Sequence, residues 1–139
     1  MDKKRGEKEK AVTTAFIKAI NDQDMEALAR LMSDDHTFID SGGRAYSGRR
    51  AMLDGWKEYF RMFPDYRITV DSLLQEGHVV AVFGAFSETW KGKKGREIKG
   101  PAAWKAVIKD GKVHHWQVYA DLSEAMAVLE SDHDDVETT

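Results

Sequence analysis

The residues best suited to chemistry are one carboxylate, Asp40, and two adjacent histidines, His114 and His115. Asp40 follows the β-forming residues 37–39 and precedes the glycine-containing turn 41–43, so we expect it at the end of a strand. A carboxylate at the mouth of an apolar cavity loses hydration, which raises its pKa and suits it to proton transfer near neutral pH. Asp40 is therefore the candidate base.

Asp40 also has a simpler interpretation. An aspartate beside glycines commonly accepts hydrogen bonds from the backbone N–H groups of its own turn. His36 alternates with Phe38 and Asp40, so the three side chains share one face if the strand is regular. His36 is thus a candidate for ligand contact, and the alternative is a histidine at the surface or capping an element.

The two adjacent histidines point to opposite faces of their strand, because side chains alternate there. His114 shares its face with Trp116 and Val118, which makes this the more apolar face and predicts that His114 points inward. An inward His114 would orient or protonate a ligand carbonyl. A shift of one residue exchanges it for His115, and Asp121 reaches the cavity only if the strand end re-aims it.

An amphipathic helix after Ser47 and Gly48 is expected to form one wall of the cavity. Its apolar residues recur every three or four positions as far as Phe63, and Pro64 follows. Trp56, Tyr59 and Phe60 lie on its apolar face, and the strands add Trp104 and Trp116. We expect these five aromatic side chains to contact a ligand, with most of the other aromatic residues in the core.

The remaining pattern predicts helices first and strands afterwards. One helix carries an apolar stripe at residues 12–20, and a shorter one follows the N-cap Asp24 and stops at 33–35. After Pro64 the pattern alternates, and four long strands are predicted at about 66–76, 78–90, 98–108 and 112–121. This order indicates an α+β fold in which helices cover one face of a strongly curved, mostly antiparallel sheet.

Composition excludes several classes of function. The 139 residues suffice for one domain, expected at 8–130 between disordered charged tails at 1–7 and 131–139. The chain has no cysteine and no HExxH or HxH spacing, so we expect no metal and no cofactor. A net charge of -3 argues against nucleic acid, and no apolar stretch is long enough for a membrane span. We expect a soluble, cytoplasmic protein.

Three passages carry a resemblance to a known family: NDQDMEALARLMSDDHTFID, SGRRAM, and DGK followed by YAD. In their order and spacing, residues 8–128 resemble the SnoaL-like branch of the NTF2-like superfamily. The resemblance implies a cone-shaped α+β barrel with a deep, largely apolar cavity, and a homodimer formed through the sheet. Members include polyketide cyclases, ketosteroid isomerases, epoxide hydrolases and dehydratases.

The resemblance to ketosteroid isomerases is incomplete at the residues that matter. Asp40 falls where those enzymes carry their base. Phe16 falls where they carry a tyrosine that stabilises the oxyanion, so we expect Phe16 to contact the ligand without donating a hydrogen bond. Residues 101–102 replace their second donor. Each missing donor would remove on the order of 3 kcal/mol of transition-state stabilisation. We therefore do not expect true ketosteroid isomerase activity.

The expected function is binding of a small, largely apolar ligand, cyclic or carbonyl-containing, in an internal cavity. Cofactor-independent isomerase, cyclase or dehydratase chemistry would then use Asp40 as base and His114 or Tyr59 as polar partner. The alternative is a non-catalytic, dimeric interaction module whose pocket is vestigial. A buried carboxylate with a shifted pKa favours the first, and a filled cavity with Asp40 bonded to its own turn favours the second.

Overall fold

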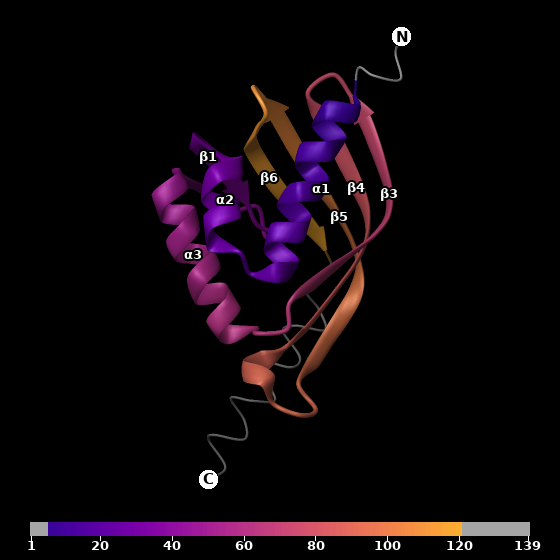
Figure 1. The fold of residues 1–139 in the computed structure, drawn as a ribbon. Coiled ribbons are helices and arrows are strands. Elements are labelled where there is room, and N and C mark those ends of the chain that lie inside the picture. Colours follow the sequence, from indigo (N-terminus) through magenta and orange to yellow (C-terminus); the bar gives the residue numbers. More distant parts are fainter. Residues whose placement is uncertain (1–5, 121–139) are drawn as a thin grey trace.

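The computed structural model describes residues 6–120, which form three helices on one face of a curved sheet (Figure 1). The helices are α1 (Glu7–Asp22), α2 (Met25–Leu31) and α3 (Arg49–Met62). The strands are β1 (Met32–Ile39), β2 (Ala45–Ser47), β3 (Arg67–Glu76), β4 (Val79–Thr89), β5 (Glu97–Lys109) and β6 (Lys112–Ala120), with a short 3-10 helix, η1 (Trp90–Gly92), after β4. The predicted α+β class is confirmed.

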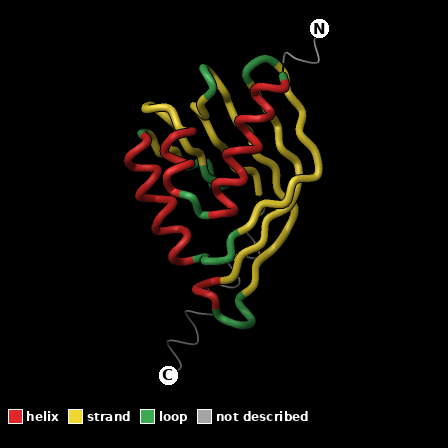
Figure 2. The backbone as a smooth tube through the Cα atoms, in the orientation of Figure 1, coloured by secondary structure: helices red, strands yellow, loops and turns green. Residues whose placement is uncertain are grey.

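The six strands form one sheet in the order β2-β1-β6-β5-β4-β3. All neighbours are antiparallel except β1 and β6, which run parallel. The sheet does not close on itself, and all three helices lie on its concave side (Figure 2). The helices and the curved sheet therefore face each other across the interior of the domain.

Local sequence explains where the elements begin and turn. The Asp24 side chain caps α2 by accepting a hydrogen bond from the backbone N–H of Ala27, at 3.1 Å. Asp110 and Gly111 both adopt left-handed backbone angles between β5 and β6, the conformation that a two-residue hairpin requires. On α1 the predicted stripe is buried at Phe16 and Ile20.

Two predicted boundaries differ from the structure, and one strand was not predicted. Helix α2 ends at Leu31, so Met32 belongs to β1, where it pairs with Val113 of β6 instead of continuing the helix. Glu7 begins α1, although the charged tail was expected to include it. The short strand β2 was not predicted. The predicted acidic tail at 131–139, the closing helix before it and Asp121 all lie outside the described residues.

Candidate functional site

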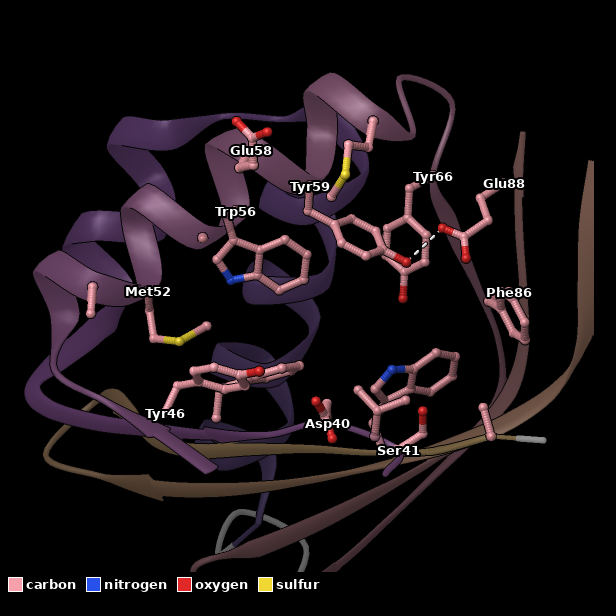
Figure 3. A pocket seen from close by; sticks show the side chains of 17 residues that line it. Asp40, Ser41, Tyr46, Met52, Trp56, Glu58, Tyr59, Tyr66, Phe86 and Glu88 are labelled. Carbon is pink, nitrogen blue, oxygen red and sulfur yellow. Dashed lines mark hydrogen bonds between the residues drawn. The ribbon is translucent and has the colours of Figure 1, made fainter. Parts of the chain in front are cut away.

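A pocket of about 470 Å³ lies between α3 and the concave face of the sheet (Figure 3). Its walls come from α3, from the strands β1, β2, β4, β5 and β6, and from the turns next to them. Aromatic and aliphatic side chains dominate this lining: Phe38, Asp40, Ser41, Tyr46, Ala51, Met52, Gly55, Trp56, Glu58, Tyr59, Met62, Tyr66, Phe86, Glu88, Trp104, Val118 and Ala120. The pocket is thus an apolar space with a small number of polar groups, the usual character of a ligand site.

Helical spacing brings one face of α3 to the pocket. Met52, Trp56 and Tyr59 follow one another at intervals of four and three residues, so their side chains project to the same side of the helix. The rings of Trp56 and Tyr59 are nearly perpendicular, with centroids 6.1 Å apart. This packing fixes both rings, and they form the helical wall of the pocket.

Glu88 is the most unusual residue of the site. It lies near the end of β4 and is only 6% exposed, and its Oε2 accepts a hydrogen bond from the Tyr59 hydroxyl at 2.5 Å. Burial raises the pKa of Glu88 to about 7, while the hydrogen bond from Tyr59 lowers it and the charge of Asp65 raises it further. Glu88 therefore changes charge close to neutral pH.

Two tyrosines lie next to Glu88. The rings of Tyr59 and Tyr66 are 5.2 Å apart and almost perpendicular, and both line the pocket. Burial, followed by the nearby charge of Glu88, raises the pKa of both phenols above the usual value. Both hydroxyls are therefore protonated at physiological pH, which makes them hydrogen-bond donors.

Asp40 combines the two interpretations that its sequence context offers. It lines the pocket, as expected for a functional carboxylate. Its Oδ1 also accepts hydrogen bonds from the backbone N–H groups of Gly42, at 3.0 Å, and Arg44, at 2.9 Å. The turn thus holds the Asp40 carboxylate in a fixed orientation at the wall of the pocket.

Four of the nine predicted site residues line the pocket: Asp40, Trp56, Tyr59 and Trp104. Phe16, His36, Phe60 and Trp116 are buried in the core instead.

His36 neither caps an element nor lies at the surface, because β1 begins earlier than predicted and includes it. Its Nδ1 bonds to the carbonyl oxygen of Val113 at 2.7 Å, and burial lowers its pKa. The Phe16 ring packs between His36 and Trp116.

The prediction that His114 points into the cavity is wrong. The register of β5 and β6 shifts between the pairs Val107–His115 and Ile108–Val113, so His114 is an extra residue in a bulge. Its Nδ1 lies 3.3 Å from the carboxylate of Asp35, whose side chain is 81% exposed. Neither histidine of this pair lines the pocket.

Sequence analysis missed Glu88 and Tyr66. A signal for Glu88 was present in β4, where Val80, Val82 and Phe86 occupy alternate positions and are buried. Continuing that alternation places Glu88 on the same buried face. A charged residue on the apolar face of a strand is a candidate functional group, because burial disfavours its charged form.

The polar groups of the pocket are carboxyls, hydroxyls and indoles. Within residues 6–120, the structure contains no cluster of three or more histidine, aspartate or glutamate side chains arranged to hold a metal ion.

None of the helices in this part of the chain has the length and apolar character needed to cross a membrane.

Comparison with known proteins places the fold. The sequence profile described as the SnoaL-like domain matches residues 13–116. None of the curated proteins matches the chain in sequence. Among solved structures, a hypothetical protein with a ketosteroid isomerase-like fold from Catenulispora acidiphila, in complex with trimethylamine, has a TM-score of 0.75 and 21% identity, and the match covers 84% of this chain and 89% of that one.

Two further solved structures have a similar fold and belong to proteins named for an activity. A protein from Jannaschia sp. CCS1 assigned to the SnoaL-like polyketide cyclases has a TM-score of 0.78 and 17% identity, covering 87% of this chain and 90% of its own. An LEH-like epoxide hydrolase from M. tuberculosis has a TM-score of 0.77 and 13% identity, covering 94% and 96%. At these identities the likeness establishes the NTF2-like and ketosteroid isomerase-like fold, which was predicted, and no activity.

Proposed function

We propose that this chain, which belongs to the family of SnoaL-like domains, binds a small, largely apolar molecule in the pocket and acts on it by acid/base chemistry. The observation that carries this proposal is the pocket itself. Its volume of about 470 Å³ is not filled by the surrounding aromatic side chains. Its lining is mainly apolar and includes three carboxyl groups. An apolar space with a few convergent polar groups is the common form of a small-molecule site.

The lining favours a cyclic or carbonyl-containing ligand. Trp56 on α3 and Trp104 and Phe86 on the sheet offer flat apolar surfaces from opposite walls. Flat rings pack well against such surfaces, and burying them supplies most of the binding free energy. A carbonyl oxygen would accept a hydrogen bond from the hydroxyl of Tyr66 or Ser41, because the hydroxyl proton of Tyr59 is already donated to Glu88.

Asp40 is the proposed base. Two backbone N–H groups hold its Oδ1, so the carboxylate stays oriented at the pocket wall beside Ser41. Taking a proton from a carbon next to a carbonyl gives an enolate, and returning that proton to another carbon completes a cofactor-independent isomerisation. In a cyclisation the enolate instead attacks a second carbonyl of the same molecule, whose oxygen takes the proton. In a dehydration a β-hydroxyl leaves with the proton as water. Phe16 supplies no donor, and it packs in the core away from the pocket, so true ketosteroid isomerase activity is not proposed.

The second candidate is a non-catalytic interaction module with a vestigial pocket. The hydrogen bonds from the turn to Asp40 favour it, because holding the turn is a sufficient structural role for the carboxylate. The unfilled pocket and the buried Glu88 favour ligand binding instead, since a vestigial cavity has no need of a buried carboxyl.

Thermal unfolding in the presence of steroid-like, terpene-like and polyketide-like compounds tests the proposal. A ligand present at about 100 times its dissociation constant adds roughly 2.7 kcal/mol to the free energy of unfolding. We expect one class to raise the melting temperature of the wild type and to lose that effect in Trp56→Ala. Trp90→Ala is the matched control, because Trp90 packs on Phe63 and does not line the pocket.

Asp40→Asn separates binding from chemistry. The amide oxygen retains the hydrogen bonds from the turn, so this variant should fold and bind while losing turnover of any substrate that the panel identifies. If no compound shifts the melting of the wild type, or if Trp90→Ala abolishes the shift as fully as Trp56→Ala, the pocket is not the ligand site. The interaction module would then be the better explanation.

A further inference from the structure

Glu88 is a buried acid to which the proposed function assigns no role. Among the residues that the structure describes, Tyr59 donates its hydrogen bond, and the groups that shift its pKa include no lysine, arginine or histidine. A buried carboxylate without a cationic partner is costly for a folded protein. Such a group is explained if a cation occupies the adjacent space when the protein works.

The ionisable groups in the lining are all acids or phenols. Asp40, Glu58 and Glu88 line the pocket, and no lysine, arginine or histidine of the described residues does. Seven aromatic side chains contribute to the same lining: Phe38, Tyr46, Trp56, Tyr59, Tyr66, Phe86 and Trp104. The face of an aromatic ring carries partial negative charge and attracts an ammonium group within about 6 Å. Both features select a cation over an anion.

We propose that the ligand of this pocket carries an alkylammonium group, which lies against the aromatic rings beside Glu88 and takes the Glu88 carboxylate as its counter-ion. This inference names the class of ligand for the proposed site and rests on that site being a ligand pocket. Alkyl substituents on nitrogen keep the group compatible with apolar walls, because they spread the charge and replace hydrogen-bond donors that the walls cannot satisfy.

The end of the pocket near Glu88 has the shape that such a group requires. Figure 3 shows Tyr59, Tyr66 and Glu88 close together there. The ring of Tyr59 is nearly perpendicular to those of Trp56 and Tyr66, at 77° and 82°. Rings at right angles turn their faces in different directions, so a compact cation in the pocket could meet more than one ring face.

Binding of a cation should be coupled to the ionisation of Glu88. The groups that face this carboxyl are Tyr59, Tyr66 and Asp65; the first two are neutral and the third is an acid. None of them stabilises the charged form as a cation does. A bound ammonium therefore lowers the pKa of Glu88 from about 7, and binding near neutral pH releases a proton.

The test compares choline with dimethylbutanol, its uncharged isostere, in which a tert-butyl group replaces trimethylammonium. Choline keeps its charge at every pH, so any pH dependence of its affinity comes from the protein. Dissociation constants are measured by calorimetry from about pH 5 to about pH 9, for wild type and Glu88→Gln. Glu76→Gln is the matched control, because Glu76 is an exposed carboxylate on β3 outside the pocket.

We expect choline to bind the wild type at least about tenfold more tightly than dimethylbutanol above pH 7. Below about pH 7 this advantage should disappear, with a loss of affinity of up to about tenfold for each pH unit until the two compounds bind equally. Glu88→Gln should remove both the preference and the pH dependence, while Glu76→Gln should behave as wild type. Repeating the titration near pH 7 in buffers of different ionisation enthalpy should show that choline binding releases about half a proton.

Equal binding of the two compounds, or a choline affinity that Glu88→Gln leaves unchanged, would overturn the alkylammonium assignment. If neither compound binds, the assignment also fails. In these cases the panel of apolar compounds with Trp56→Ala still decides whether the pocket binds a neutral ligand, so the two proposals fail separately. The amide oxygen that Glu88→Gln introduces can accept the Tyr59 hydrogen bond, and circular dichroism verifies that the variant is folded.

Discussion

Glu88 shows how much a single buried group can influence both stability and binding. The residue occupies a position where the alternation of β4 calls for an apolar side chain, next to the buried residues Phe86 and Tyr66. Its pKa of about 7 is the direct result of that burial. When no cation is present, this carboxyl therefore stays protonated up to about neutral pH.

This pKa predicts a specific dependence of stability on pH. The pKa of Glu88 rises from the ordinary 4.5 to about 7 in the folded protein, so the folded state holds the proton more tightly than the unfolded state. The Glu88 contribution to the free energy of unfolding therefore decreases as pH rises from about 4.5 to about 7, by on the order of 3 kcal/mol in total.

Glu88→Gln removes this contribution. We expect the variant to match the wild type near pH 4 and to become the more stable of the two above pH 7, as measured by urea unfolding at both pH values. Glu76→Gln should track the wild type throughout. If the wild type instead becomes more stable than Glu88→Gln as pH rises, the pKa of Glu88 is not raised in the folded protein, which contradicts this prediction.

Individual residues were predicted well where local pattern decides their position. The three- and four-residue spacing on α3 placed Trp56 and Tyr59 in the pocket wall, and the turn after β1 placed Asp40 there. His114 was assigned to the wrong place because strict alternation cannot foresee a bulge, and the bulge depends on how β5 pairs with β6. Glu88 was not predicted as a site residue because the apolar residues of β4 were used to identify the strand and not to decide which face Glu88 occupies.

The close contact between β3 and β4 depends on Gly84. A Cβ atom added at Gly84 would lie 1.9 Å from the carbonyl oxygen of Thr69, and 3.1 Å from the Cα of Val70. Gly84 pairs with Val70 just where the register of the two strands shifts. Only glycine allows the two backbones to approach this closely.

Gly84→Ala should therefore destabilise the protein by about 3 kcal/mol or prevent folding, because backbone atoms would have to move. Gly55→Ala is the matched control. Gly55 lies inside α3, nothing lies within 4 Å of an added Cβ there, and alanine favours a helix by about 1 kcal/mol. Thermal unfolding of both variants measures the contrast, and equal effects would contradict the close contact.

Most elements could be predicted because their patterns are long. The strands from Arg67 to Ala120 alternate over nine or more residues each. Short turns that contain Gly77 and Gly111 join β3 to β4 and β5 to β6. The boundary between α2 and β1 could not be predicted, since Met32 fits the helical stripe equally well. Its parallel pairing with Val113, which lies far along the chain, is what assigns it to the strand.

The whole domain is a layer of helices over a curved sheet, and the pocket is the space that these two layers leave between them. The family resemblance predicted this architecture. The volume of the pocket depends on how the side chains of α3 meet those of β4 and β5, which no local pattern reports. Dimerisation through the sheet remains a prediction; Leu74, Phe83 and Tyr119 are large apolar residues of the sheet that are exposed in the single chain.

Ligand binding in the pocket is tested most directly by the indole N–H signals of the four tryptophans in proton–nitrogen correlation spectra, each assigned with a Trp→Phe variant. The ligand is the compound that stabilises the wild type most in the thermal panel. We predict that the signals of Trp56 and Trp104, which line the pocket, shift on binding, while that of Trp90 stays in place. A shift confined to Trp90, or no shift at saturating ligand, would contradict binding in this pocket.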